Sequence, residues 1–270
     1  MYIKTRSFFI LIAVLSIFSS CSDYYQLSKE KSTATNEEKK VAAIQYYEDA
    51  EYLKTITLLD QVMAFYNLTS EGEELNYIYC MSNYYLEDFY LSGYYFKRFI
   101  RKYPKSKHAE EALFLSSLCS VQNSPQYSLD QTETYNALDQ LQIFIDEYPN
   151  SDRIDTCNIL MDNLRAKLEI KQYEYAKLYY QTENYKAAVV ALEQTLQKYP
   201  ESTYKEDILY LIVMSNFKLA INSIEEKKLE RLNNTLKSYR TFVAAFPESI
   251  KLTELEGVRK QTEKAIAELK

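Results

Sequence analysis

The tetrapeptide Tyr199-Pro200-Glu201-Ser202 is one of four near-copies of an aromatic-Pro-x-Ser sequence. The other copies are Tyr103-Pro104-Lys105-Ser106, Tyr148-Pro149-Asn150-Ser151 and Phe246-Pro247-Glu248-Ser249. Proline cannot continue a helix, and it forces the residue before it out of helical geometry. Serine two residues later is a good N-cap, because its hydroxyl accepts bonds from the free N–H groups of a new helix. We therefore predict that each copy ends one helix, turns the chain and begins the next.

The composition favours helices throughout. Only three glycines and five prolines occur in 270 residues, too few for the many turns of an all-β or α/β fold. Hydrophobic residues make up 47% of the chain, which is enough for a core, and tyrosine is unusually common at 27 copies. The formal charge of −6 argues against a nucleic-acid binder, which would present a net basic surface.

Amphipathic segments alternate along the chain from residue 37. A degenerate copy of the turn, Phe65-Tyr66-Asn67, ends the second segment without a proline, and Asn123 to Gln126 interrupts the pattern. A stretch from 151 to 182 has neither glycine nor proline, which predicts one long helix or two placed end to end. The other helices are expected over 37–52, 54–66, 70–87, 90–103, 106–121, 133–148, 185–199, 203–220, 229–246 and 251–269.

Each pair of segments shares an internal pattern of small and large residues. Ala176 and Ala188 lie where the two helices before Pro200 would cross, and Leu192 follows one turn later. Other pairs repeat this arrangement, with Ala43, Tyr46 and Leu59, then with Cys80, Ser92, Phe96 and Phe99. This is the tetratricopeptide pattern of helix–turn–helix units that stack into a solenoid. We predict an all-α fold of about five repeats, with repeats 1–3 over 37–150 and repeats 4–5 plus a capping helix over 151–270.

The N-terminus predicts export. Lys4 and Arg6 precede an apolar run from Phe8 to Phe18, which is too short to span a membrane, so residues 1–20 are expected to be a signal peptide. Small residues directly before Cys21 resemble a bacterial lipobox, although Phe18 stands where leucine is usual. We predict that Cys21 is lipidated, palmitate included, and that 21–36 is a flexible tether. Ordinary secretion with cleavage nearby is the alternative.

Two stretches carry a more specific resemblance. Ser128-Leu129-Asp130-Gln131-Thr132-Glu133-Thr134, followed by Phe144-Ile145-Asp146-Glu147-Tyr148-Pro149-Asn150-Ser151, resembles the third repeat of the BamD-type outer-membrane assembly lipoproteins. Leu164-Arg165-Ala166-Lys167-Leu168, followed by Glu174-Tyr175-Ala176, is similar to the family's junction of repeats three and four. The resemblance covers essentially the whole mature chain. It implies a lipid-anchored scaffold at the periplasmic face of the outer membrane, within the machinery (the BAM complex) that inserts β-barrel proteins.

The sequence offers little for catalysis. The single histidine, His108, lies eleven residues from Cys119 on one expected helix, about 16 Å away, so the two cannot act together. No phosphate-binding glycine loop or Cys-x-x-Cys motif is present, and one histidine is too few for a metal site. We predict no enzyme activity, no cofactor and no metal.

Two further residue groups are expected to be structural. Cys80, Cys119 and Cys157 lie in the first helices of successive units, and we favour buried thiols over a disulfide. Acidic pairs near helix starts are expected to be solvated and to complement the helix dipole. They are Glu37-Glu38, Glu73-Glu74, Glu110-Glu111 and Glu225-Glu226.

The aromatic cluster between residues 77 and 99 is the candidate binding surface. Neighbours on a helix point about 100° apart, so the adjacent tyrosines of this cluster cannot all face one core. By resemblance, the N-terminal repeats receive the aromatic-ended C-terminal signal of unfolded barrel proteins. The candidate contacts are Tyr77, Tyr84, Tyr85, Tyr94 and Tyr95, with a repeat-core role as the alternative.

A basic run follows this cluster: Lys97, Arg98, Arg101, Lys102, Lys105 and Lys107. Cations suit a helix C-terminus, and contact with an acidic partner or lipid headgroups is the alternative.

The resemblance implies two partners, unfolded outer-membrane proteins and the periplasmic domains of a BamA-like barrel insertase. A generic tetratricopeptide lipoprotein that coordinates envelope or cell-wall proteins remains an alternative. A glycan-binding lipoprotein is a more distant one, because such proteins use Trp platforms and this chain has no Trp.

Overall fold

The computed structural model describes residues 24–29, 31–67 and 69–269, and every regular element in these ranges is helical. The predicted signal peptide and Cys21 lie outside them. No helix in the described part of the chain is both long and apolar enough to cross a membrane. The helices are α2 (Asn36–Glu48), α3 (Tyr52–Tyr66), α4 (Gly72–Tyr85), α5 (Phe89–Lys102), α6 (Ala109–Asn123), α7 (Thr132–Glu147), α8 (Ile154–Gln181), α9 (Tyr185–Lys198), α10 (Lys205–Ile221), α11 (Glu225–Ala245) and α12 (Leu252–Glu268).

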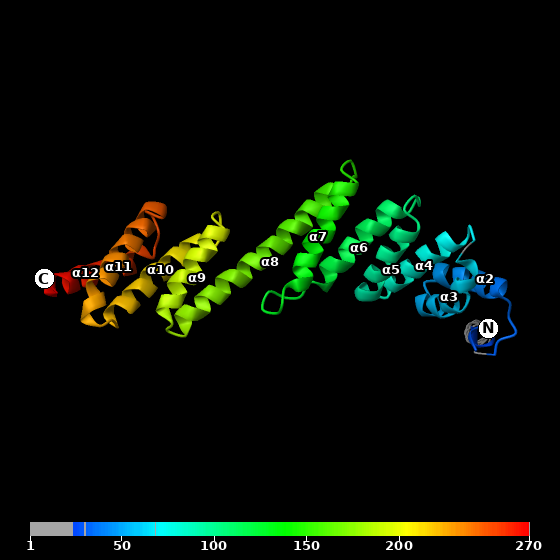
Figure 1. Cartoon of the computed structure of the whole chain (residues 1–270), viewed down its shortest axis with the longest axis horizontal. Helices are drawn as coiled ribbons and strands as arrows, with labels where there is room; N and C mark the ends of the chain where they lie inside the picture. The colour runs from blue at the N-terminus through cyan, green and yellow to red at the C-terminus, as the bar shows by residue number, and fades with distance from the viewer. Residues whose placement is uncertain (1–23, 30, 68, 270) are drawn as a thin grey trace, which may run out of the picture. The chain divides into compact units, whose positions relative to one another are not determined.

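These helices form two compact units. Of the described residues, unit 1 comprises those up to Pro125 together with 130–161, and unit 2 comprises 126–129 together with 162–269. In unit 1 each helix from α2 to α7 packs on the next, as Figure 1 shows. In unit 2, α9 packs on α10, α10 on α11, and α12 closes against α10 and α11. The α2–α3, α4–α5, α6–α7, α8–α9 and α10–α11 pairs are repeats 1 to 5, so the predicted helical repeat fold is confirmed.

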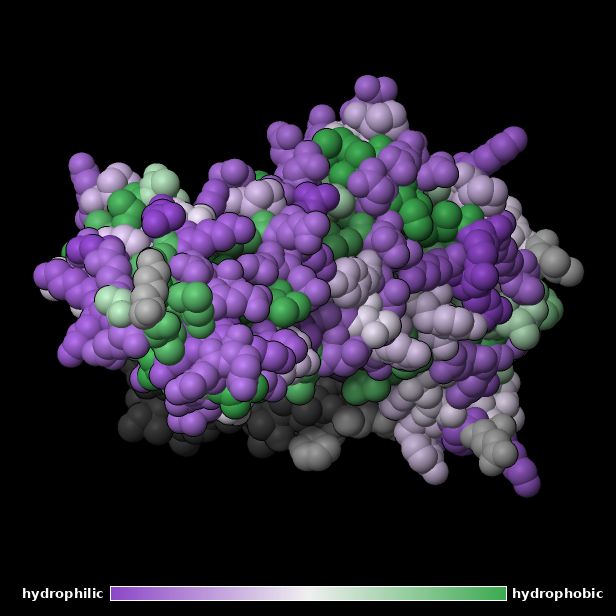
Figure 2. Space-filling model, turned by 60° about the vertical axis from the view of Figure 1, so that its left-hand side comes forward, coloured by the Kyte–Doolittle hydropathy of each residue, from purple (hydrophilic) through white to green (hydrophobic). Residues whose placement is uncertain are grey.

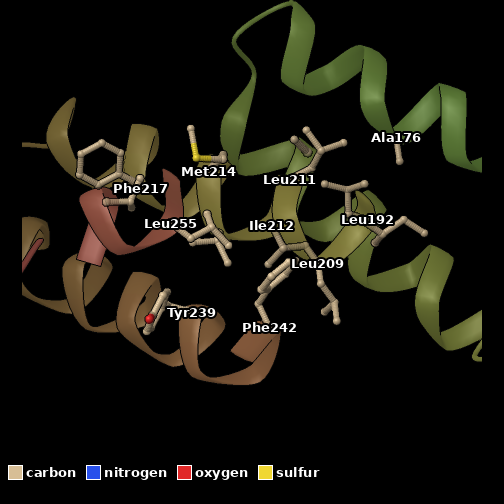
Figure 3. Packing of buried hydrophobic residues seen from close by; sticks show 14 of the residues in the cluster. Ala176, Leu192, Leu209, Leu211, Ile212, Met214, Phe217, Tyr239, Phe242 and Leu255 are labelled. Carbon is tan, nitrogen blue, oxygen red and sulfur yellow. The ribbon is translucent and has the colours of Figure 1, made fainter. Parts of the chain in front are cut away.

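The expected long segment is one continuous helix, α8, of 28 residues. The boundary between the two units falls inside it, after Met161, whereas the sequence placed the division at residue 150. The later part of α8 belongs to unit 2, where Tyr173 and Ala176 join the core with α9 and α10. Figure 3 shows this core, with Leu192 of α9 and Phe242 of α11 lying near Leu209 and Ile212 of α10.

The second helix of every repeat buries the same positions. Counted back from the aromatic residue of the turn, the eleventh position is small and completely buried in all five repeats. These residues are Thr55, Ser92, Ala137, Ala188 and Thr235. The seventh position is large and buried: Leu59, Phe96, Leu141, Leu192 and Tyr239. A small residue at the crossing lets the paired helix approach, and the large residue one turn later fills the space beside it. The predicted small–large pattern is confirmed.

The turn inside repeats 1, 2 and 4 is a Schellman-type cap. In repeat 2 the N–H of Asp88 donates to the carbonyl of Asn83 at 3.1 Å, and the N–H of Glu87 donates to Tyr84 at 3.0 Å. The residue in the left-handed conformation is usually glycine. Here it is Ala50, Glu87 or Glu183, with φ of 59°, 59° and 62°. The described helices therefore include three strained turns at one repeat position, where a side chain costs roughly 1 kcal/mol relative to glycine.

The described part of the expected flexible tether is folded against repeat 1. Residues 24–28 are helical, and the Tyr24 ring meets Tyr46 edge-on with centroids 5.8 Å apart. Gln61 Nε2 donates to the carbonyl oxygen of Ser28 at 2.9 Å, and Leu27 packs on the core of repeat 1. Thr35 and Glu38 form a capping box that opens α2. The packing of Tyr24 and Leu27 against repeat 1 explains why this polar-looking segment does not remain free.

Candidate partner-binding surface

The four aromatic-Pro-x-Ser turns share one geometry. The N–H of the serine donates to the carbonyl of the aromatic residue, as from Ser106 to Tyr103 at 3.0 Å and from Ser202 to Tyr199 at 3.1 Å. Proline occupies the second position of this turn, where its fixed φ is suitable. The same bond closes Tyr148-Pro149-Asn150-Ser151 and Phe246-Pro247-Glu248-Ser249. The predicted role of these residues as helix-stopping turns agrees with this geometry.

The serine does not cap the following helix in the predicted way. Helices α6 and α10 begin three residues after Ser106 and Ser202, with His108 and Tyr204 at their N-cap positions. Each serine hydroxyl instead accepts the N–H of the residue two positions later, at 3.0 Å for His108 and 3.1 Å for Tyr204. This local bond stabilises the turn and delays the helix.

Each serine hydroxyl also donates to a glutamate of the preceding repeat. Ser106 donates to Glu73 at 2.7 Å, Ser151 to Glu110 at 2.6 Å and Ser202 to Glu169 at 2.6 Å. Ser249 bonds Glu206 in the same way. These bonds join each turn to the first helix of the preceding repeat, near its start for Glu73, Glu110 and Glu206 and in the middle of α8 for Glu169, so the turn is the link between repeats.

A second contact runs beside each serine–glutamate bond. The residue four after the glutamate meets the residue two after the serine. Tyr77 stacks on His108 at 3.9 Å between centroids, and Tyr173 stacks on Tyr204 at 4.5 Å. Arg153 lies over Phe114 and Lys251 over Tyr210, at 5.0 and 5.4 Å. In repeat 1, Lys40 and Glu71 occupy these two places as an ion pair at 3.0 Å.

These contacts correct the expectation that the acidic pairs only cap helices. Glu73 and Glu110 hold the serines of the following turns, and Glu111 accepts from Tyr77 at 2.7 Å and meets Arg153 at 3.6 Å. Glu37 accepts from Tyr66 at 2.9 Å, and the pKa of Glu37 is lowered by its bonds to Lys40 and Tyr66. Glu73, Glu110 and Glu111 therefore belong to the contacts between repeats, whereas Glu37 is bonded within repeat 1.

Tyr77 must be removed from the candidate binding surface. Its side chain is buried, its ring lies on His108, and its hydroxyl is bound to Glu111. Burial and this carboxylate raise the pKa of Tyr77. A residue that joins repeats 2 and 3 is not available to a partner, so the alternative of a repeat-core role holds for it.

The other candidate tyrosines fall into two ring clusters. Tyr85 is exposed and stacks on Tyr52 at 4.8 Å, near the half-buried Tyr84. Tyr95 is half buried and packs edge-on against Tyr79 at 4.8 Å, while Tyr94 beside it is exposed. Tyr85 and Tyr94 are therefore the two candidates whose rings most clearly reach solvent.

Exposed apolar side chains extend this surface beyond the predicted residues. Tyr90 is 76% exposed, and Leu86 and Leu91 are also exposed. Tyr90 and Tyr94 are four residues apart on α5 and share one face. The sequence signal for Tyr90 and Leu91 was their place off the buried stripe of Ser92, Phe96 and Phe99.

Basic side chains continue along the same face of α5. Lys97, Arg98 and Arg101 are exposed and follow Tyr90 and Tyr94 at helical spacing. The rest of the predicted basic run lies beyond this face, where Lys102 bonds Asn67 and Lys107 meets Glu74 at 3.5 Å. The exposed stripe of α5 thus changes from aromatic to cationic along its length.

The histidine and the three cysteines of the described residues are engaged in packing contacts. His108 is stacked on Tyr77, with Nε2 3.2 Å from Glu74. Cys80, Cys119 and Cys157 are buried free thiols, as predicted, and burial raises the pKa of Cys119 to about 11. Such thiols are protonated at neutral pH and react poorly. The described residues contain no cluster of His, Cys, Asp and Glu that would hold a metal.

The sequence of this chain matches a known protein family. The family model YfiO, described as "Outer membrane lipoprotein", matches residues 35–232 and 166–267, which together span almost all the described helices. The chain belongs to this family. The YfiO match confirms the outer-membrane lipoprotein class predicted from the turns and the two specific stretches.

Two relatives of known role support the YfiO assignment. The Pasteurella multocida "Outer membrane protein assembly factor BamD" is 23% identical over 96% of this chain and 99% of its own length. The Caulobacter vibrioides protein of the same name is 22% identical over 55% of this chain, and the match spans about half (49%) of that relative. The resemblance to BamD-type proteins is therefore confirmed.

A solved structure of the "TPR2AB-domain:pHSP90-complex of yeast Sti1" aligns with 84% of this chain and 98% of its own, with a TM-score of 0.37 and 10% identity. That likeness is too distant to bear on function.

Proposed function

We propose that this protein is a non-catalytic, lipid-anchored scaffold of the machinery that assembles outer-membrane β-barrel proteins. The observation that carries the proposal is the family match over residues 35–267, joined by a BamD relative aligned over 96% of the chain. The buried thiols and the stacked histidine support a role in binding rather than catalysis.

The anchor would be Cys21, three residues before the first described residue. Because Tyr24 packs on Tyr46 and Ser28 is held by Gln61, little free chain separates this cysteine from repeat 1. Three extended residues reach about 10 Å. An acyl group on Cys21 would therefore hold the α2–α3 end of unit 1 close to the periplasmic face of the outer membrane, and two or more chains make such anchoring stable.

The exposed stripe of α5 would receive unfolded barrel proteins. Tyr90 and Tyr94 offer rings for an aromatic side chain, and Lys97, Arg98 and Arg101 follow them with positive charge. A segment that ends in an aromatic residue carries its own negative charge at the terminal carboxylate. The order of rings and cations along α5 suits such an end. The cationic contact would weaken as salt is added, because exposed charges are screened.

The repeats of unit 2 would bind the periplasmic domains of the barrel-forming insertase, the second partner that the resemblance implies. Recovery of an insertase with its associated lipoproteins, after affinity capture of the full lipidated chain, is the expected result. Recovery of cell-wall enzymes alone would contradict the proposal and would favour the generic tetratricopeptide lipoprotein.

A further inference from the structure

Two hollows lie at the same repeat position, one in each unit. In unit 1 a hollow of about 150 Å³ lies between α3 and α5 above α4, lined by Asp60, Met63, Asn76, Tyr79, Cys80, Tyr95 and Arg98. In unit 2 a groove of about 470 Å³ lies between α9 and α11 above α10. Its lining is Val189, Glu193, Leu196, Leu209, Ile212, Asn216, Asn234, Lys237, Ser238 and Thr241. We call this the α9–α11 groove.

Six lining residues of the unit 1 hollow occupy the same repeat positions as six lining residues of the α9–α11 groove. Asp60 and Glu193 each lie six residues before a turn aromatic, and Tyr95 and Ser238 each lie eight residues before one. Arg98 and Thr241 correspond in the same way, and Tyr79 corresponds to Ile212. The α9–α11 groove therefore lies at the same place between repeats 4 and 5 as the smaller hollow between repeats 1 and 2. It has the small residues Ser238 and Thr241 where the hollow has Tyr95 and Arg98.

In unit 1 the position equivalent to Ser238 is filled by a tyrosine ring. In unit 1 the Tyr95 ring packs edge-on against Tyr79, and the two hydroxyls lie 3.5 Å apart, so the space is mostly closed. In unit 2 the corresponding serine turns its hydroxyl toward its own helix, bonding the carbonyl of Asn234 at 3.0 Å and accepting from Asn216 at 3.3 Å. The place of the Tyr95 ring is left open.

The open groove has a floor and walls suited to a ring from outside. Leu209 and Ile212 of α10 form an apolar floor and lie beside Phe242, as Figure 3 shows. Asn216 and Ser238, which are bonded to each other, also line the groove and supply polar atoms of the kind that a buried tyrosine hydroxyl usually requires. On the face of the molecule that Figure 2 shows, hydrophilic residues dominate, with separate apolar patches between them.

Charge defines the two sides of the groove. Glu193 on α9 and Lys237 on α11 are exposed at its rim, and neither makes an ion pair or side-chain hydrogen bond with another described residue. In unit 1 the position of Lys237 is held by Tyr94 and carries no charge. A carboxylate beside the inserted ring would form an ion pair with Lys237, whereas a positively charged side chain of the partner would be repelled there.

We propose that the α9–α11 groove binds a protein segment that inserts a tyrosine or phenylalanine ring, with an acidic residue on the α11 side. The inserted ring takes the place that Tyr95 fills in repeat 2. The inference rests on the proposed scaffold role and specifies the partner chemistry of unit 2.

The test uses the purified full mature chain and short peptides that are acetylated and amidated at their ends. Each peptide carries a central Tyr, Phe or Ala, with either Asp or Lys beside it, and binding is followed by fluorescence anisotropy. Tyr and Phe peptides flanked by Asp should bind at least tenfold more tightly than their Ala or Lys counterparts. Equal binding of the Tyr and Ala peptides, or no binding at millimolar concentration, would overturn the proposal.

Variants separate the groove from the rest of unit 2. Ser238→Tyr fills the ring position from within and should weaken peptide binding at least tenfold, while Asn233→Tyr, on an exposed position of α11 outside the groove, should not. Lys237→Glu should reverse the preference from Asp-flanked to Lys-flanked peptides, which keeps the test informative if the tyrosine variant folds poorly. Unchanged peptide binding by Ser238→Tyr would also overturn the groove proposal. If this variant still captured the insertase, the proposed function would stand.

Discussion

The hydroxyl of Ser106 donates to the carboxylate of Glu73 at 2.7 Å, thirty-three residues earlier in the chain, and the same pairing recurs between Ser202 and Glu169. The glutamate lies on the first helix of one repeat and the serine in the turn before the first helix of the next. The two remaining pairs, Ser151 with Glu110 and Ser249 with Glu206, are separated by longer intervals because repeats 3 and 5 contain longer connections or helices. A short hydroxyl–carboxylate bond thus sets the register of adjacent repeats.

Removal of this hydroxyl should destabilise the joint. Ser106→Ala loses the bond to Glu73 and the one from the His108 N–H, and should lower the free energy of unfolding by about 1–2 kcal/mol. Urea unfolding followed by circular dichroism measures this. In a double-mutant cycle, Ser106→Ala and Glu73→Ala should be non-additive, because each removes the same bond. Additive losses would show that the pair is not coupled.

Pro200→Ala should be milder than Ser202→Ala. The alanine turn can keep the Ser202 bonds to Glu169 and Tyr204, so the loss is mainly the fixed φ of proline, worth about 0.4–1 kcal/mol. The same urea titration compares the two variants. A larger loss for Pro200→Ala than for Ser202→Ala would mean that the proline, rather than the hydroxyl, holds the repeats together.

Glycine should relieve the three left-handed turns. Glu87→Gly and Glu183→Gly place glycine at φ near 60° and should raise the free energy of unfolding by up to about 1 kcal/mol each. Glu87→Ala is the matched control, since alanine keeps the Cβ atom that causes the strain. If the alanine variant gained as much stability as the glycine variant, the strain would not come from the backbone.

Alkali should unfold the protein through its tyrosines. Burial is the main cause that raises the pKa of Tyr47 and Tyr173 to about 12 each, from an ordinary value near 10. A raised pKa means that the folded state favours the neutral phenol, so this stability is complete below about pH 10 and is lost as pH rises through the folded values. Tyrosinate absorbance and helical circular dichroism should change together above about pH 10. Full ionisation with the helices intact would contradict this.

The α5 stripe should bind the aromatic end of a barrel protein. Tyr90→Ala with Tyr94→Ala should weaken binding of a synthetic C-terminal barrel peptide about tenfold or more, while Tyr135→Ala on α7, where the tyrosine is also exposed, should not. Amidation of the peptide's terminal carboxylate should reproduce the effect of Arg98→Ala with Arg101→Ala. Binding that is indifferent to both changes would remove α5 from the substrate site.

The repeat architecture could be predicted because proline and small crossing residues act locally. A proline such as Pro104 ends a helix whatever the tertiary contacts are, and a position where two helices cross closely, such as Ser92, accepts only a small residue. The role of Glu73 could not be predicted in the same way, since an acidic residue in a first turn is explained equally well by the helix dipole. Its partner became visible only when the register between repeats was known.

The candidate site was predicted in part for a similar reason. The sequence showed that adjacent tyrosines must face different ways, and Tyr85 and Tyr94 are indeed exposed. It did not show that Tyr77 faces His108, because that contact depends on how repeat 3 sits on repeat 2. The sequence also did not show that residues 24–28 pack on repeat 1. That packing depends on the contact between Tyr24 and Tyr46 of α2, and nothing in the polar sequence of the segment requires this contact.

The central claim is that this protein promotes the assembly of outer-membrane barrels. The most direct measurement is depletion of the protein in its own cells, followed by quantification of folded barrel proteins in the outer membrane. The account predicts that barrel levels fall together across several barrel proteins while other envelope lipoproteins persist. Unchanged barrel levels after depletion would contradict it.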